Sequence, residues 1–336
     1  MFFKGPPLPA SPVTIRLPRF AAIVLATLLA ASGCTTSSVL ESSAVTPLVS
    51  EKYAAIVVDA GNGKVLFARA ADEPRYPASL AKMMTLYLLF EALDAGKISL
   101  ATPIPVSANA ASRPPSRMGL KAGQTIDVET AIRCLATKSA NDVAVAVAEF
   151  LAGSEEQFAA VMTSRARQLG MRSTVFRNAS GLPDLEQRTT ARDMAALSVA
   201  LRKRYPHHYH YFSDRSFTYA GKVIRGHNDL IGGVAGVDGL KTGYIRASGY
   251  NVATSVRRGG RGLVVVVMGG ETAKSRNAHV EELIEAYFPR TVAAAAPARI
   301  SRPAPAGMPP PVAQDVVATS HAGAPGPTPP AAIGQY

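Results

Sequence analysis

Cysteine is scarce in this chain, which has only Cys34 and Cys134 among its 336 residues. If Cys34 is chemically modified, Cys134 has no partner thiol and no internal disulfide can form. The apolar neighbours Ile132 and Leu135 predict a buried, unreactive thiol at Cys134 rather than a nucleophile. The chemistry of the chain is therefore expected to depend on other residue types.

Patterns that would indicate several other kinds of protein are also lacking. The sequence contains no internal repeat, and its basic residues do not alternate with aromatic ones as in nucleic-acid-binding modules. The apolar run near the N-terminus, Phe20–Ala31, is too short to form a stable membrane-spanning helix. The formal net charge of +12 suits an exported protein that faces anionic envelope polymers or lipid headgroups, and we expect no nucleic-acid partner.

The first 34 residues have the features of a secretory signal. Three basic residues precede the apolar run, which ends in the sequence Ala31-Ser32-Gly33-Cys34. This ending resembles a bacterial lipobox, whose cysteine is acylated and becomes the mature N-terminus. Leucine is more usual at the position of Ala31, so ordinary signal cleavage remains an alternative. We expect export to the periplasm, with attachment to the membrane through Cys34 if the lipid is added.

Composition divides the remainder of the chain into three parts. Residues 35–50 are rich in serine and threonine and predict a flexible linker. Residues 51–290 carry the helix and strand patterns of one folded domain, which would hold the active site. Residues 291–336 include ten of the 25 prolines, many alanines and no apolar periodicity, which is typical of a disordered tail.

The folded domain has strand patterns at both ends and helix patterns between them. Asn62-Gly63 between two short apolar runs indicates a β-hairpin, and the apolar run Leu263–Val267 indicates a central strand. We predict an α/β (α+β) fold with an antiparallel sheet built from both ends of the domain, flanked by helices, with an inserted helical region. The stretch 102–124 is polar and rich in turn residues. Strands are expected at 55–59, 65–68, 216–219, 222–225, 240–244, 250–255 and 262–268, and further helices at 128–149, 154–169, 191–204 and 275–287.

The segment Tyr76–Lys82 carries a strong chemical signal. Pro77 suits the first turn of a helix, which places Ser79 where backbone N–H groups favour an oxyanion. Lys82 follows three residues later on the same face of the helix. The helix continues to about Ala95 and is apolar almost all round, so it should be buried and the pKa of Lys82 lowered. Serine beside such a lysine is an activated nucleophile.

Two further motifs accompany this pair. Lys241-Thr242-Gly243 lies on an expected strand, where the lysine and threonine present a cation and a hydroxyl, and the glycine would let a ligand backbone lie close. Ser139-Ala140-Asn141 offers a hydroxyl and an amide at a break in a helical region. The pattern Ser-x-Asn also occurs at 107–109 and 275–277. We select Ser139 because it lies between helical stretches, about midway between the other two motifs.

In this order the three motifs resemble the signature of penicillin-recognising serine enzymes. Their longer context is similar to one branch, the serine-type D-alanyl-D-alanine carboxypeptidases, which are low-molecular-mass penicillin-binding proteins. The resemblance covers about residues 51–290 and implies a β-lactamase/transpeptidase-like fold. The matching segments are Tyr76–Thr85, Lys138–Asp142, Asn178–Pro183, Thr190–Met194, Val237–Tyr244 and Met268–Gly270.

The resemblance implies a role for each catalytic residue. Ser79 would be the acylated nucleophile, and Lys82 would be its general base. Ser139 would relay a proton to the leaving amine. The backbone N–H groups of Ser79 and Tyr244 would form the oxyanion hole.

The resemblance also implies how substrate would bind. Asn141 would hold the substrate amide, Lys241 would raise the local positive potential, and Thr242 would contact the terminal carboxylate beside Gly243. Arg276 falls at the spacing where the family has an arginine near that carboxylate. Peptidoglycan stem peptides ending in D-Ala-D-Ala would be the substrates, and β-lactam antibiotics would act as covalent inhibitors.

The activity so implied is release of the terminal D-alanine from stem pentapeptides, without a metal or organic cofactor. A D,D-endopeptidase acting on cross-links has the same motifs, and a non-catalytic penicillin-binding sensor is a further alternative. A class A β-lactamase needs Glu-x-x-Leu-Asn between the second and third motifs, and no glutamate in that interval has asparagine four residues later. The cluster His207–His210 has neither a carboxylate nor a cysteine framework beside it, so we interpret these histidines as solvated rather than metal-binding.

Overall fold

The computed structural model describes residues 51–288. The predicted signal, the linker, acylation of Cys34 and the tail at 291–336 lie outside the described residues. None of the helices within residues 51–288 is long and apolar enough to cross a membrane.

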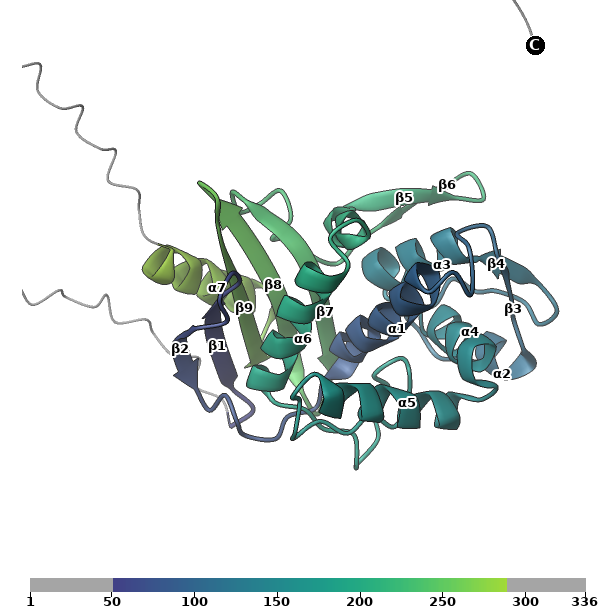
Figure 1. Cartoon of the computed structure of the whole chain (residues 1–336), viewed down its shortest axis with the longest axis horizontal. Helices are drawn as coiled ribbons and strands as arrows, with labels where there is room; N and C mark the ends of the chain where they lie inside the picture. The colour runs from purple at the N-terminus through teal and green to yellow at the C-terminus, as the bar shows by residue number, and fades with distance from the viewer. Residues whose placement is uncertain (1–50, 289–336) are drawn as a thin grey trace, which may run out of the picture. The chain divides into compact units, whose positions relative to one another are not determined.

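One antiparallel sheet of five strands organises this part of the chain (Figure 1). The first two strands and the last three form it together, as the sequence predicted, because β1 pairs with β9. In sheet order the strands are β2 (Val65–Arg69), β1 (Ala54–Asp59), β9 (Arg261–Gly270), β8 (Gly249–Arg258) and β7 (Val237–Ile245). Strand β7, which carries the Lys-Thr-Gly motif, is therefore an edge strand.

Alternate side chains of β1 and β9 face two separate apolar cores. Ile56 and Val266 belong to the larger core, whereas Val57 and Val265 belong to the smaller one. Helix α7 (Ala273–Tyr287) covers the smaller core, and α6 (Ala191–Arg204) lies on the opposite face of the sheet (Figure 1). This two-sided burial explains why β9 is an unbroken apolar run.

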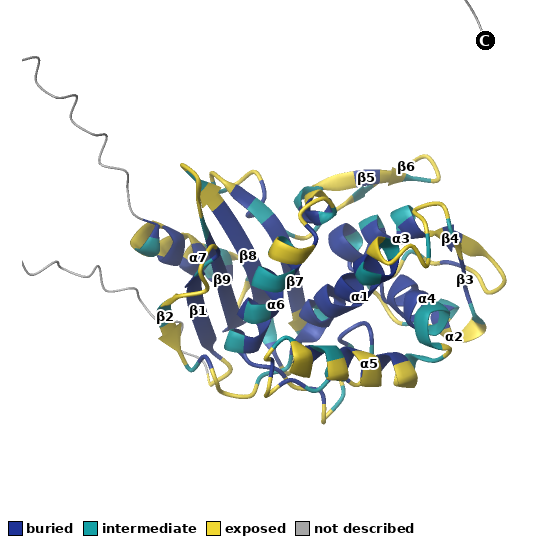
Figure 2. Ribbon diagram, viewed as in Figure 1, coloured by how far each residue is buried: buried dark blue, intermediate teal, exposed yellow. Residues whose placement is uncertain are grey.

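The helices between the strands form the inserted region that the sequence predicted. Helix α1 is buried along almost its whole length (Figure 2), which agrees with its nearly uniform apolar sequence. Ser154 and Thr190 cap α5 and α6 with their side-chain oxygens. The helices of this region that precede α6 include α1 (Lys82–Asp94), α3 (Val128–Arg133), α4 (Asn141–Ala152) and α5 (Glu155–Gln168).

The polar stretch 102–124 and the three residues after it contain regular elements that the sequence did not predict. Strand β3 (Pro103–Pro105) pairs with β4 (Thr125–Asp127), and a short helix, α2 (Ala108–Ala111), lies between them. These elements are too short to show a periodicity. The predicted hairpin of β5 (Ser216–Tyr219) and β6 (Lys222–Arg225) is confirmed.

Candidate active site

Ser79 lies in a short 3-10 turn, Ala78–Ala81, that leads directly into α1. The sequence placed Ser79 in the first turn of the α-helix itself, which was wrong in detail because Ala78 has a positive φ of 48° and cannot begin an α-helix. The loop at 178–182 packs against this bend. A Cβ atom at Gly181 would lie 1.8 Å from the Ala78 carbonyl oxygen, so only glycine fits there, and the turn and the loop fix each other.

Lys82 is fully buried, and its side-chain nitrogen lies among three oxygens. The Nζ atom is 3.3 Å from Ser79 Oγ, 2.7 Å from Asn141 Oδ1 and 2.5 Å from the Ser180 carbonyl oxygen. Burial holds the pKa of Lys82 well below its usual value, and the charge of Lys241 lowers this pKa further. The neutral amine is thereby favoured, within reach of the Ser79 hydroxyl proton.

Ser139 and Asn141 lie at the break between α3 and α4. A turn of π-helix, Cys134–Lys138, ends at Ser139, whose backbone is left-handed with φ of 62°. The buried Ser139 Oγ has no hydrogen-bond partner among residues 51–288, so its hydroxyl is available to a bound molecule. The Asn141 side chain, in contrast, accepts from Lys82 and donates to the Pro114 carbonyl oxygen over 2.9 Å. Asn141 therefore also orients Lys82, which the sequence did not predict.

The Lys-Thr-Gly motif lies on β7, directly beside the Ser79 turn. Lys241 is buried and donates to the Thr242 carbonyl oxygen over 2.8 Å; burial, together with the charge of Arg276, lowers the pKa of Lys241 to about 7. A Cβ atom at Gly243 would lie 2.9 Å from Ser79 N. The sequence interpretation reserved this space for a ligand backbone, but the closest neighbour is the chain's own turn at Ser79. Gly243 is needed so that β7 and Ser79 can meet.

Arg276 comes from the first turn of α7, which packs behind β8 and β9. Only 2% of its surface is exposed. Its guanidinium donates to the Asn251 carbonyl oxygen over 3.0 Å and to Asn277 Oδ1 over 2.6 Å. Burial lowers the pKa of Arg276 to about 10, so it remains charged at neutral pH.

These residues meet at a cleft of about 350 Å³. Tyr244 lies at its rim, with 52% of its surface exposed and its ring 4.3 Å from that of Tyr250. The two lysines are buried behind the lining residues. The predicted residues that line the cleft are Ser79, Ser139, Asn141, Thr242, Gly243, Tyr244 and Arg276.

Several lining residues were missed by sequence reasoning. His227 lines the cleft and also a neighbouring cleft of about 460 Å³. Its pKa is lowered by burial and by the nearby charge of Lys241, yet no local pattern marks it. Ser180 lies in a segment whose resemblance to the family was visible, but the acceptor that it offers Lys82 is a backbone carbonyl, which sequence does not encode.

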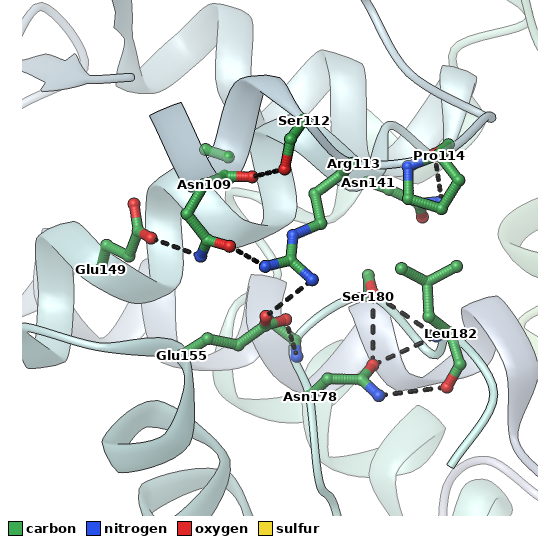
Figure 3. Close-up of polar contacts among 12 residues, drawn as sticks. Asn109, Ser112, Arg113, Pro114, Asn141, Glu149, Glu155, Asn178, Ser180 and Leu182 are labelled. Atoms are coloured by element: carbon green, nitrogen blue, oxygen red, sulfur yellow. Dashed lines mark hydrogen bonds and ion pairs between the residues drawn. The ribbon is translucent and has the colours of Figure 1, made fainter. Parts of the chain in front are cut away.

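A polar network holds the loops around the cleft together (Figure 3). Glu155 at the start of α5 accepts from the backbone N–H of Ala179 over 3.1 Å, and its second oxygen lies 3.9 Å from Arg113 Nη1. Arg113 also donates to Asn109, whose amide donates to Glu149 over 2.8 Å. Glu155 thus fixes the residue next to Ser180, the carbonyl partner of Lys82. It does not line the cleft itself.

Replacing Glu155 with alanine should therefore disturb both stability and acylation. Leaving the Ala179 N–H without its acceptor costs about 1–3 kcal/mol, which corresponds to a loss of several degrees in Tm for a domain of this size. Thermal melts and penicillin acylation rates should both fall. Glu155→Gln, which retains an acceptor oxygen, should lose less, and the exposed neighbour Glu156 provides a matched control as Glu156→Ala. Normal acylation in Glu155→Ala would show that the network does not position Lys82.

Lys82, Lys241 and Arg276 place three buried basic groups around one cleft. None of them forms an ion pair with a carboxylate among residues 51–288. Burial is the largest cause of the lowered pKa at each. Arg276 remains charged, and buried charges are normally paired, so this cleft is suited to an anionic group supplied by a ligand.

The sequence interpretation of the histidine cluster was wrong on one point. His207 and His208 do have a carboxylate beside them, because both Nε2 atoms lie against Asp94 Oδ1, at 2.8 and 3.0 Å. Asp94 is far away in the sequence, so no local spacing could reveal it.

Cys134 is buried as predicted, and burial raises the pKa of its thiol.

Comparison with known proteins shows the family of this chain. The family described as D-alanyl-D-alanine carboxypeptidase matches residues 41–272. The chain belongs to this family. It is 34% identical over 250 residues to D-alanyl-D-alanine carboxypeptidase DacF of Bacillus subtilis, covering 72% of this chain and 63% of DacF. It is 36% identical over 236 residues to DacA of Escherichia coli, covering 68% of this chain and 59% of DacA.

A solved structure extends the likeness to the fold. Penicillin-Binding Protein D2 from Listeria monocytogenes, in its cefotaxime-bound form, matches with a TM-score of 0.65 and 31% identity, covering 73% of this chain and 100% of that one. The predicted family and its transpeptidase-like fold are thus confirmed. The chain spans about three fifths of the length of the curated carboxypeptidases that it matches.

Proposed function

We propose that this chain is an exported serine D,D-carboxypeptidase that removes the terminal D-alanine from peptidoglycan stem peptides. The observation that carries the proposal is the position of Ser79 Oγ, 3.3 Å from the nitrogen of a fully buried lysine. The same cleft also contains Arg276, which forms no ion pair with a carboxylate within residues 51–288, and family membership supports the same activity.

In the proposed reaction, Lys82 in its neutral form takes the hydroxyl proton as Ser79 Oγ attacks the carbonyl carbon between the last two D-alanines. The oxyanion that forms would be held by the N–H groups of Ser79 and Tyr244. The proton would pass through Ser139, whose hydroxyl has no other partner among residues 51–288, to the leaving amine. An ester at Ser79 would remain, and water would then hydrolyse it to release the shortened peptide.

Recognition of the substrate would depend on its free terminal carboxylate. Thr242 and Arg276 both line the cleft, and Lys241 is buried beside them. A carboxylate between these groups would supply the missing negative charge and form charge-assisted hydrogen bonds with the guanidinium. This arrangement favours a substrate that ends at the cleft.

A direct test is incubation of the purified protein with a peptide ending in D-Ala-D-Ala, followed by chromatography of the products. Free D-alanine should appear with time, and prior treatment with penicillin should prevent its release. We infer that β-lactams acylate Ser79, because the similar Listeria protein has been solved in a cefotaxime-bound form. A protein that binds penicillin but releases no D-alanine would be a sensor instead.

The proposal also includes attachment to the membrane through a lipid on Cys34. The lipobox-like ending at Cys34 supports addition of the lipid. Once added, several acyl chains on one residue would hold the protein firmly to a bilayer. The protein should fractionate with membranes, and Cys34→Ser should move it to the soluble fraction or block processing. Cys134→Ser is the control. Soluble wild-type protein, cleaved elsewhere than directly before Cys34, would indicate ordinary secretion.

A further inference from the structure

A second cluster of functional side chains lies at the end of α1 opposite to Lys82. Asp94 is the last residue of α1, and it meets His207 and His208 from the segment after α6. The three candidate ligand atoms, one carboxylate oxygen and two imidazole Nε2 atoms, lie within 4.8 Å of one another. No other group of three histidine, cysteine or acidic residues is arranged in this way within residues 51–288.

The donor set, two imidazole nitrogens and one carboxylate oxygen, is one that divalent transition metals bind. Two imidazoles and one carboxylate are the three protein ligands of many zinc sites, with a water in the fourth position. Bonds of about 2.0–2.1 Å around a tetrahedral ion place ligand atoms roughly 3.3–3.5 Å apart. The two Nε2–Oδ1 distances, 2.8 and 3.0 Å, therefore need to lengthen by roughly 0.3–0.7 Å, and the two Nε2 atoms lie within 4.8 Å of each other. Partial exposure of His207 and Asp94 leaves room for the ion and its water.

The cluster is also held in place by its surroundings. The His208 ring stacks on Phe90 of α1, with centroids 4.8 Å apart and an interplanar angle of 18°. Phe90 is fully buried, so the imidazole is supported by the core. The His208 ring thus has a fixed orientation before an ion binds, which reduces the entropy lost on binding.

We propose that Asp94, His207 and His208 bind Zn²⁺ as three protein ligands, with water in the fourth position, and that the bound ion stabilises the fold. The ion would tie the end of α1 to the segment that continues into the turn Tyr209–Ser213. That turn is anchored on the sheet, because the Ser213 hydroxyl donates to the Asp238 carbonyl oxygen of β7 over 2.7 Å. The ion would therefore brace the helix that begins at Lys82 against the strand that carries Lys241. None of its three ligands lines the catalytic cleft.

The test is titration of the untagged full chain with ZnCl₂ by calorimetry, with thermal melts at each zinc concentration. One saturable ion per chain is expected, together with a rise in Tm of several degrees when free Zn²⁺ exceeds Kd about a hundredfold. Co²⁺ should give visible absorption bands of a low-symmetry site with nitrogen and oxygen ligands. The wild-type protein should be acylated by penicillin at the same rate with and without bound Zn²⁺, since none of the three ligands lines the catalytic cleft.

Two variants separate this site from adventitious binding. His207→Ala removes a largely exposed ring, and Asp94→Asn keeps the size of the side chain but removes its charge; each should weaken Zn²⁺ binding at least tenfold and remove the cobalt bands. His210→Ala is the matched control, since His210 lies in the following turn, Tyr209–Ser213, and contributes no atom to the cluster, although its Nδ1 lies 2.9 Å from the His207 carbonyl oxygen. It should bind Zn²⁺ as the wild type does. The proposal is overturned if the wild type binds no Zn²⁺, or if both site variants retain its affinity and stoichiometry, which would place the ion elsewhere, for example at Cys34.

Discussion

Ser79→Ala should form no covalent adduct with penicillin and should release D-alanine about 10⁶-fold more slowly, as for other serine hydrolases that lose their nucleophile. The effect is large because the substitution removes the atom that forms the new bond. The fold should remain intact, since Ser79 is partly exposed and, within residues 51–288, the one hydrogen bond of its hydroxyl is the long one with Lys82 at 3.3 Å. Intact-mass spectrometry with penicillin, combined with a thermal melt, measures both outcomes.

A second serine in the same cleft provides the control for this experiment. Ser180 lines the cleft, and its hydroxyl bonds to Asn178 over 3.2 Å, whereas Lys82 contacts only its backbone carbonyl. Ser180→Ala should therefore keep the adduct, because the carbonyl is unchanged. An adduct that persists in Ser79→Ala, or one that disappears only in Ser180→Ala, would mean that the nucleophile has been wrongly assigned.

Arg276→Ala should strongly reduce D-alanine release from peptides with a free terminal carboxylate. Removing one partner of a partly desolvated charge pair costs about 2–5 kcal/mol, or roughly thirty- to several-thousand-fold in kcat/KM. The same loss of charge should raise the pKa of Lys241, since Arg276 is one of the causes that lower it. The kcat/KM of Arg276→Lys should lie between those of the wild type and Arg276→Ala, because lysine keeps the charge but not the planar fork of the guanidinium.

The substrate provides the matched comparison for Arg276. A peptide whose terminal carboxylate is amidated should be poor with the wild type and should lose little more in Arg276→Ala. Measurement of kcat/KM for both peptides with both proteins gives the coupling directly. Equal losses on the two peptides would show that Arg276 supports the fold through Asn251 and Asn277. Unchanged kcat/KM on both would remove Arg276 from the site and would favour an endopeptidase that tolerates a continuing chain.

The sequence predicted those parts of the structure that repeat along the chain or that lie close together in it. The three-residue spacing of Ser79 and Lys82 placed both on one face, and the apolar run at 263–267 identified the strand at the centre of the sheet. The three-residue strand β3 and the four-residue helix α2 show no periodicity and were missed, whereas the equally short strands β5 and β6 were predicted as a hairpin. Their stability comes from tertiary packing rather than from local preference.

Contacts between segments far apart in the sequence account for the features of the site that the sequence did not predict. Asn141 and the Ser180 carbonyl both contact Lys82 from segments that are far away in sequence, and Asp94 meets His207 in the same way. Gly243 shows a related limit, because the sequence indicated a close approach there but not what approaches. Only the fold reveals that the neighbour is Ser79 N.

The pairing of β1 with β9 also determines when this domain can fold during synthesis. Val57 lies opposite Val265 in the sheet, so the second strand to be paired with β1 becomes available only after the whole helical region has been made and exported. Until then the apolar faces of β1 and α1 have no sheet to cover them, and such chains fold slowly and aggregate readily. A frameshift or a stop codon anywhere before β9 should therefore yield an unfolded fragment rather than a smaller active enzyme.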